Sequence, residues 1–226
     1  MRLEPLGDSA WLIRVADGFD PENSLGAVVG RLRQLEAASI PGVIDLVPSF
    51  TTIGVFVDQE RAADFDALKA RIEAALEPEP VPADSPARGE LEIPVCYDRE
   101  FGLDLDEVAR HTELSTDEII DRHSAAIYRV AAVGFTLGFP YLSGLPPELA
   151  TPRRSSPRTE IPAGSVAIGG TQTGIYPRKS PGGWNIIGRT PLPLFEIQRD
   201  PPALLKIGDS VRLRPISREE FERISR

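Results

Sequence analysis

The densest run of polar, charged and aromatic side chains in this sequence lies between residues 158 and 191. Gln172 and Tyr176 stand near its centre, and an amide and a phenol can both donate a hydrogen bond to a carbonyl oxygen. Arg178 and Arg189 follow, and a guanidinium group can hold a carboxylate through two parallel hydrogen bonds. A polar rim whose charges face water is the plainer interpretation, but so many functional groups in one run favour a small-molecule site.

An aromatic segment, GFTLGFPYL at residues 134–142, precedes this run. Its glycines permit positive φ angles, and its aromatic rings offer flat apolar walls. Taken alone, the segment would be a buried turn. The substrate-binding residues expected from the two segments together are Arg158, Thr173, Arg178, Ser180, Trp184, Asn185, Arg189, Phe139 and Tyr141.

His123 is the candidate general base, because imidazole is the side chain that changes charge nearest neutral pH. It shares a predicted helix with several isoleucines, so a core histidine is an equally supported interpretation. The catalytic hypothesis is that His123, Gln172 and Tyr176 converge on one pocket. There they would stabilise charge on a carbonyl oxygen and move a proton to a leaving nitrogen.

Other kinds of site are not indicated by the residues. The glycine spacing of residues 164–174 matches neither a P-loop nor a Rossmann turn, and no metal-binding motif surrounds the two histidines. Cys96, the single cysteine, lies in an apolar strand-like run and is expected to be a buried structural thiol. A net charge of −9 argues against nucleic-acid and anionic-membrane partners, although Arg153, Arg154 and Arg158 form a candidate basic patch.

The elements that must position these residues divide at a linker. Residues 1–78 predict a small α+β domain, with strands at 10–15, 43–47 and 51–57 and amphipathic helices at 25–38 and 62–76. The strands at 43–47 and 51–57 predict a hairpin that turns at Pro48-Ser49. Residues 79–89 are rich in proline and acidic residues and predict an extended connector.

Residues 90–226 predict a domain of short strands punctuated by glycine and proline, typical of a barrel or closed sheet. Capping boxes are predicted at Ser115 with Glu118 and at Ser217 with Glu220, each opening a helix. The expected strands lie at residues 91–97, 129–135, 165–169, 184–187, 194–197 and 210–215.

Several of these segments together resemble the 5-oxoprolinase B-subunit family, also called allophanate hydrolase subunit 1 or the Kip-type kinase-inhibitor family. The most specific segment is PAGSVAIGGTQTGIYPRKSPGGWNIIGRTP at residues 162–191; GFTLGFPYLSGLP at 134–146 and PRRSSPR at 152–158 agree as well. The resemblance covers essentially the whole chain. One departure is Leu137, which stands where the family usually has a proline.

The resemblance implies an α+β fold, with a small N-terminal α+β domain followed by a cyclophilin-like β-barrel. It implies a component of an ATP-dependent amidohydrolase, with Mg and ATP as cofactors, that is inactive without its partners. Those partners would be a homologous second subunit, of the 5-oxoprolinase C-subunit or allophanate hydrolase subunit 2 type, and a lactam-opening subunit. The substrate would be 5-oxoproline, cleaved to glutamate, or a compound of the allophanate or urea type.

Two functions other than amide hydrolysis are alternatives for this chain. A regulatory protein could inhibit a sensor histidine kinase through the barrel rim, and the barrel fold alone raises a weaker idea of prolyl isomerase activity. The sequence has no apolar signal core and no run of membrane-spanning length, so a cytoplasmic protein is expected.

Overall fold

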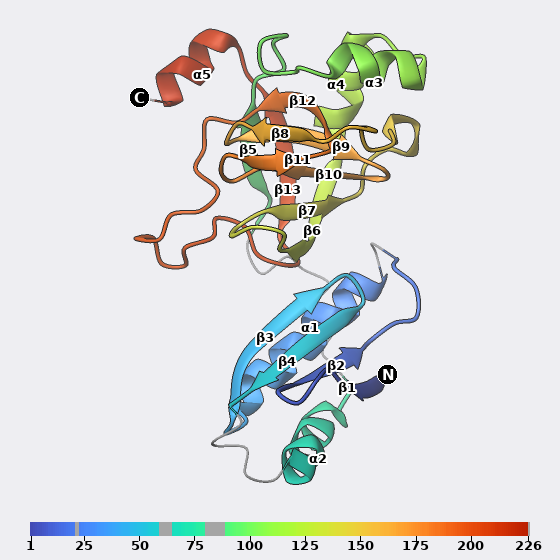
Figure 1. Ribbon diagram of the computed structural model, residues 1–226, viewed down its shortest axis with the longest axis vertical. Helices are drawn as coiled ribbons and strands as arrows, with labels where there is room; N and C mark the ends of the chain where they lie inside the picture. The colour runs from blue at the N-terminus through green and yellow to red at the C-terminus, as the bar shows by residue number, and fades with distance from the viewer. Residues whose placement is uncertain (21–22, 59–64, 80–88, 226) are drawn as a thin grey trace. The chain divides into compact units, whose positions relative to one another are not determined.

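The structure, a computed structural model of the chain, describes residues 1–20, 23–58, 65–79 and 89–225 (Figure 1). The chain divides into two compact units, Met1–Ala87 and Arg88–Arg226. The predicted linker at 79–89 lies outside the described residues except at its ends, so the domain boundaries stay a prediction. None of the described helices is long and apolar enough to cross a membrane.

The first unit is an antiparallel sheet with two helices. Its strands are ordered β1, β2, β4, β3, and every predicted element is present, while β1 was not anticipated. The expected start of the second helix, Ala62, lies outside the described residues. The elements are β1 (Arg2–Pro5), β2 (Ala10–Arg14), α1 (Asn23–Ala38), β3 (Val43–Ser49), β4 (Thr52–Val57) and α2 (Phe65–Leu76).

Apolar spacing explains the core of this unit. Leu25, Val28, Leu32 and Leu35 recur at helical intervals on α1, and all are buried where the helix packs on β3, β4 and α2. The β3–β4 hairpin is confirmed, but its turn lies two residues later than expected. Ser49 still pairs with Thr52, and the chain reverses through Phe50, whose φ is 41°.

The second unit is built on a longer sheet. Strands follow the order β5, β13, β6, β7, β10, β9, β12; β13 pairs parallel with β5, and the other neighbours are antiparallel. Strands β8 and β11 form a separate two-stranded ladder. The elements are β5 (Leu91–Val95), α3 (Leu105–Thr112), α4 (Thr116–Ala125), β6 (Ile127–Val133), β7 (Pro140–Ser143), η1 (Pro147–Leu149), β8 (Arg158–Ile161), β9 (Ser165–Gly169), β10 (Gln172–Ile175), β11 (Ser180–Gly182), β12 (Asn185–Arg189), β13 (Ser210–Pro215) and α5 (Arg218–Ile224).

The predicted closed barrel is not formed as a complete ladder. The two ends of the path, β5 and β12, meet only at an isolated bridge between Cys96 and Arg189, whose backbone N–H···O distances are 2.8 and 2.9 Å. The strand expected at 194–197 is also wrong. Only Phe195 is paired there, in a single bridge with Ala203, because prolines flank the segment and remove backbone donors.

Both predicted N-cap serines are observed, but only the first forms a capping box, because the Glu220 carboxylate accepts from Arg214 instead. The Ser115 hydroxyl accepts from the Glu118 amide at 3.2 Å while the Glu118 carboxylate accepts from the Ser115 amide at 2.9 Å, which completes a capping box at α4. Ser217 accepts from the Glu220 amide and begins α5. Figure 1 shows α3, α4 and α5 toward one end of the second unit, where α3 packs on β12 and α4 on β13.

Side-chain alternation gives the second unit's sheet two different apolar faces. On β9, Val166 and Ile168 join the main core with residues of α3 and α4, whereas Ala167 faces the other way. Ala167 belongs to a smaller aromatic cluster with Phe139, Tyr176 and Trp184. This division determines which of the predicted site residues can meet.

Candidate functional site

An aromatic pocket of about 200 Å³ lies on the smaller face. Phe139 is at its centre, with ring centroids 4.9 Å from Tyr141, 5.1 Å from Tyr176 and 5.6 Å from Trp184, all in edge-to-face contact. The Arg153 guanidinium lies 5.8 Å from the Trp184 ring. The pocket is lined by Phe135, Phe139, Tyr141, Arg153, Arg154, Pro157, Tyr176, Gly182, Gly183 and Trp184.

Two glycines make room for these rings. A Cβ at Gly169 would collide with the Trp184 indole, and a Cβ at Gly182 would collide with the Tyr176 hydroxyl and lie 2.8 Å from Ile161 Cδ1. The aromatic walls therefore depend on glycine at both positions. Burial raises the pKa of Tyr176, against a smaller lowering by the Trp184 backbone, so its phenol stays protonated and able to donate.

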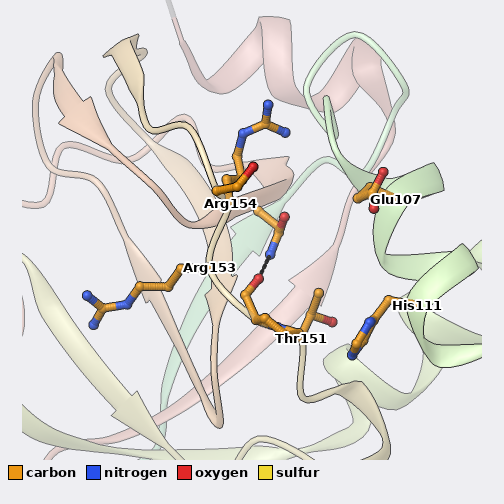
Figure 2. A pocket seen from close by; sticks show the side chains of 8 residues that line it. Glu107, His111, Thr151, Arg153 and Arg154 are labelled. Atoms are coloured by element: carbon orange, nitrogen blue, oxygen red, sulfur yellow. Dashed lines mark hydrogen bonds between the residues drawn. The ribbon is translucent and has the colours of Figure 1, made fainter.

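A second pocket, the polar pocket, lies on the other side of loop 151–158 and measures about 300 Å³ (Figure 2). Glu107 and His111 are one helical turn apart on α3 and both line it. Figure 2 shows His111 projecting toward Thr151, while the Arg153 guanidinium points away from the two α3 residues. The lining residues are Glu107, His111, Thr151, Pro152, Arg153, Arg154, Ser155 and Asn185.

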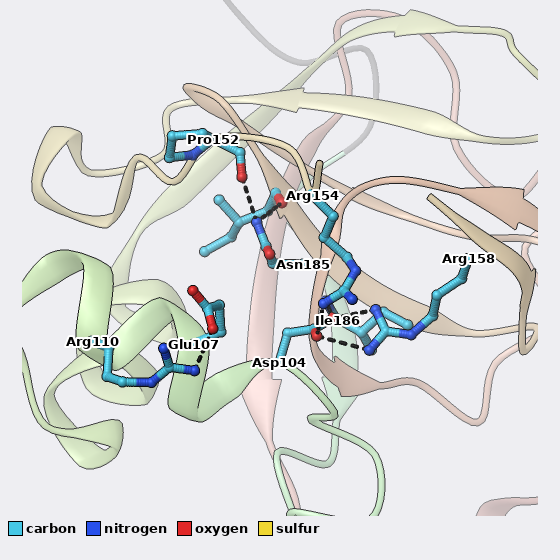
Figure 3. Close-up of polar contacts among 9 residues, drawn as sticks. Asp104, Glu107, Arg110, Pro152, Arg154, Arg158, Asn185 and Ile186 are labelled. Atoms are coloured by element: carbon cyan, nitrogen blue, oxygen red, sulfur yellow. Dashed lines mark hydrogen bonds and ion pairs between the residues drawn. The ribbon is translucent and has the colours of Figure 1, made fainter. Parts of the chain in front are cut away.

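A buried carboxylate fixes the loop between the two pockets (Figure 3). Asp104 is 4% exposed and accepts from Arg158 Nη1 and Nη2 at 2.7 and 2.8 Å and from Arg154 Nη1 at 2.7 Å. It also accepts from the Ile186 amide at 2.8 Å. Four donors from loop 151–158 and β12 hold this carboxylate at the N-terminus of α3, so the three segments are tied at one point.

This arrangement corrects the expectation for Arg158. Both of its terminal nitrogens are committed to Asp104, so the residue is structural and does not face either pocket as a free cation. Sequence reasoning missed Asp104, Glu107 and His111. The i, i+4 spacing of Glu107 and His111 was a usable signal, but nothing local to α3 indicated that loop 151–158 would lie opposite.

His123 is a core residue. It is fully buried, with Nδ1 2.8 Å from the Tyr97 hydroxyl and Nε2 3.0 Å from Thr173 Oγ1. Thr173 donates its hydroxyl proton to the Ala167 carbonyl at 3.0 Å, so it must accept from Nε2–H, and Nδ1 accepts from Tyr97. Burial lowers the pKa of His123 to about 3, which keeps the ring neutral.

The predicted convergence of His123, Gln172 and Tyr176 is therefore wrong. Thr173 carries the histidine contact on the main-core face of β10, and alternation sends Gln172 to the opposite face. Tyr176 lies in the aromatic cluster of that opposite face, and neither pocket described above includes Gln172 or His123 among its lining residues.

The remaining predicted residues are dispersed. Arg189 donates through Nε to the Ala163 carbonyl at 2.7 Å and lines a third pocket of about 430 Å³ beside α5. Arg178 is exposed, and the Ser180 hydroxyl is buried with no hydrogen-bond partner in the described part of the chain. Of the predicted set, the aromatic pocket unites Phe139, Tyr141, Tyr176 and Trp184, and the polar pocket holds Asn185.

The described residues form neither a preformed metal site nor a standard phosphate-binding loop. No group of three or more His, Cys, Asp or Glu side chains within the described ranges is placed to hold a metal ion. Asp104 is saturated by guanidinium groups, and loop 151–158 presents arginines without the glycine-rich backbone that cradles phosphates.

The chain matches known proteins along most of its length. The family model described as "Carboxyltransferase domain, subdomain C and D" matches residues 1–205. The chain is 43% identical over 229 residues to the 5-oxoprolinase B-subunit of Bacillus subtilis (strain 168), covering 97% of this chain and 95% of that protein.

Solved structures agree with this match. The structure of TTHA0988 superposes with a TM-score of 0.77 at 35% sequence identity. The match covers 92% of this chain but only 40% of that one. The K. lactis urea amidolyase superposes with a TM-score of 0.73 at 20% identity over 97% of this chain and 15% of that protein, a likeness of fold.

Proposed function

The chain belongs to the carboxyltransferase domain family, subdomains C and D, and from this membership we propose that it is one component of an ATP-dependent cyclic-amide hydrolase. Its reaction is the cleavage of 5-oxoproline to glutamate, carried out with partner subunits. The observation that carries the proposal is the 43% identity, over nearly the full length of both chains, to the B-subunit of a 5-oxoprolinase. The relatives reported above give no support to the kinase-inhibitor alternative.

The aromatic pocket is the proposed substrate site on this chain. 5-Oxoproline is a compact five-membered lactam with one carboxylate, which suits a small pocket walled by Tyr141, Tyr176 and Trp184. The Arg153 guanidinium over Trp184 provides a cation at the pocket mouth for the carboxylate. The rings also shield the buried Tyr176 hydroxyl from water, which strengthens any hydrogen bond that it makes to a ligand.

Tyr176 is the residue of this pocket that we assign to the lactam carbonyl. Its phenol is buried and stays protonated, so it can donate a hydrogen bond to the carbonyl oxygen as negative charge develops there. This role was predicted for Tyr176 from the sequence, whereas the general base is not provided by His123, which is sealed in the core. A group on a partner subunit supplies the proton in this proposal.

We place ATP and Mg on a partner subunit in this proposal, because the described residues of this chain offer neither a three-ligand metal site nor a glycine-rich phosphate loop. ATP would supply the activation of the lactam carbonyl. The partners are a homologous second subunit and a lactam-opening subunit. In this proposal the complex works in the cytoplasm, and the chain is inactive without its partners.

The test is reconstitution. This chain is purified with the two proposed partners, and 5-oxoproline-dependent ATP hydrolysis and glutamate release are measured, with allophanate and urea as alternative substrates. We expect glutamate release that is lost when this chain is omitted. Turnover of allophanate or urea without turnover of 5-oxoproline would contradict the substrate, and separate elution of the pair at micromolar concentration would contradict the assembly.

A further inference from the structure

The polar pocket is not used by the proposed lactam site, and its walls differ in charge. Arg154 lies on loop 151–158, while Glu107 and His111 lie on α3. Asn185 completes the floor from β12. A ligand here would meet a cation on one side and a carboxylate on the other.

Asn185 is the most informative group in this pocket, because it is a polar side chain that is only 2% exposed. Its Nδ2 donates to the Pro152 carbonyl at 2.8 Å and lies 3.4 Å from the Ile168 carbonyl. Two carbonyl oxygens cannot be satisfied by an amide oxygen, so the nitrogen must face them. The Oδ1 atom therefore faces the opposite way, toward the side of Glu107 in Figure 3, and accepts no hydrogen bond from the described residues.

The cationic side carries one charge in excess. Arg154 and Arg158 contribute two positive charges to the buried cluster, and Asp104 contributes one negative charge. Arg154 uses Nη1 for Asp104, and its guanidinium has further N–H groups, with the side chain 30% exposed. An anionic group would be attracted to this side of the pocket.

The opposite side offers acceptors. Glu107 pairs with Arg110 through Oε2, which leaves Oε1, and Arg110 is not among the pocket-lining residues. Glu107 Oε1 and Asn185 Oδ1 are both hydrogen-bond acceptors, as a ligand ammonium group requires. His111 lies one turn further along α3 and also lines the pocket, so its imidazole NMR signal should respond to a ligand bound there.

We propose that the polar pocket binds the zwitterion of a small α-amino acid, with its carboxylate toward Arg154 and its ammonium group toward Glu107 and Asn185. A volume of about 300 Å³ suits a compact ligand of this class. The choice of glutamate as that amino acid rests on the proposed function. It gives the chain a product site beside its lactam site, separated by loop 151–158, which lines both pockets.

Binding to the isolated full chain is followed by the imidazole NMR signals, of which there are two because the chain has two histidines. L-Glutamate should move the His111 signal in a saturable way and leave the signal of buried His123 unmoved. Glutarate is the matched probe, since it has both carboxylates and lacks the ammonium group. We expect its affinity to be at least about tenfold weaker, the effect of losing a charge-assisted hydrogen bond.

Glu107→Gln should weaken glutamate binding about tenfold and leave glutarate binding nearly unchanged. The control is Asp106→Asn, which removes the same charge from the neighbouring residue of α3, outside the pocket, and should bind glutamate like the parent chain. Equal affinity for glutamate and glutarate overturns the proposal, as does a His111 signal that no amino acid moves at high millimolar concentration.

The two proposals can fail separately. Glutamate binding on this chain without turnover of 5-oxoproline by the assembled subunits would support the amino-acid site and contradict the proposed function. Turnover of 5-oxoproline with no glutamate binding on this chain would contradict the amino-acid site alone.

Discussion

The His123 ring is held between two hydroxyl groups, and this explains both its burial and its neutrality. Tyr97 donates to Nδ1 and Thr173 accepts from Nε2–H, so a neutral imidazole satisfies every polar atom. A second ring proton would turn Nδ1 into a donor, so the Tyr97 hydroxyl would lose its acceptor there, and burial disfavours the charged ring. The residue therefore contributes to stability, and its contribution depends on pH.

Acid should weaken the fold through His123. An unfolded histidine binds a proton below about pH 6.5, while burial lowers the pKa of His123 to about 3 in the folded chain. Protons therefore favour the unfolded state in that window, and the stabilisation present above pH 6.5 is lost as the pH falls toward 3. We expect a loss of up to about 1.4 kcal/mol per pH unit between pH 6 and 4, measured by urea unfolding.

Substitution of the buried histidine tests this prediction. His123→Asn should reduce the slope of stability against pH. If His123→Asn does not fold, the His123 imidazole signal of the parent chain decides, because a signal that titrates between pH 5 and 7 would contradict a sealed neutral ring.

Asp104 is the second residue whose role can be measured. Asp104→Asn keeps the shape of the side chain but leaves Arg154 and Arg158 without their carboxylate in a mostly buried cluster. We expect a loss of about 3 kcal/mol in the free energy of unfolding, at the lower end for a broken buried ion pair because both arginines are partly exposed. Asp106→Asn, on the exposed side of α3, should cost less than about 0.5 kcal/mol, and equal losses would contradict the role of Asp104.

At the scale of elements, β11 forms one wall of the aromatic pocket. Gly182→Ala would place a methyl group against the Tyr176 hydroxyl and 2.8 Å from Ile161 Cδ1, so the tyrosine must move. In the reconstituted enzyme we expect the apparent KM for 5-oxoproline to rise at least about tenfold, as expected when a positioned hydrogen bond and a ring wall are displaced.

The adjacent glycine provides a matched control. A Cβ at Gly183 would have its nearest neighbour at 3.6 Å, on Pro157, which is ordinary van der Waals contact. Gly183→Ala should therefore leave the KM for 5-oxoproline close to the parent value. A similar effect from both alanines would contradict displacement of Tyr176 as the cause of the raised KM.

The whole molecule contains two compact units, Met1–Ala87 and Arg88–Arg226. We expect residues 90–226 to fold without the first unit, because the main core and the aromatic cluster draw only on residues of the second. The truncated chain should unfold cooperatively in urea and keep a His123 imidazole signal like that of the full chain. A truncated chain with no cooperative transition would contradict the proposed domain boundary.

Local patterns in the sequence determined most of the elements. The helical spacing of Leu25, Val28, Leu32 and Leu35, and the caps at Ser115 and Ser217, depend on residues only a few positions apart. The segment at 162–191 was specific enough to indicate the family, which the comparisons confirm. These features follow from short-range periodicity and from residue identity along one stretch of chain.

Only the tertiary structure decided which side chains meet. Residues close together in the dense polar run were separated because successive residues of a strand face opposite sides of the sheet, which divides Thr173 from Gln172 and Tyr176. Conversely, Asp104 reaches Arg158 across 54 positions, and His111 and Asn185 share a pocket although they lie on a helix and a strand far apart in the chain. Such pairings depend on the packing of α3 against β12 and loop 151–158, and no local pattern contains that information.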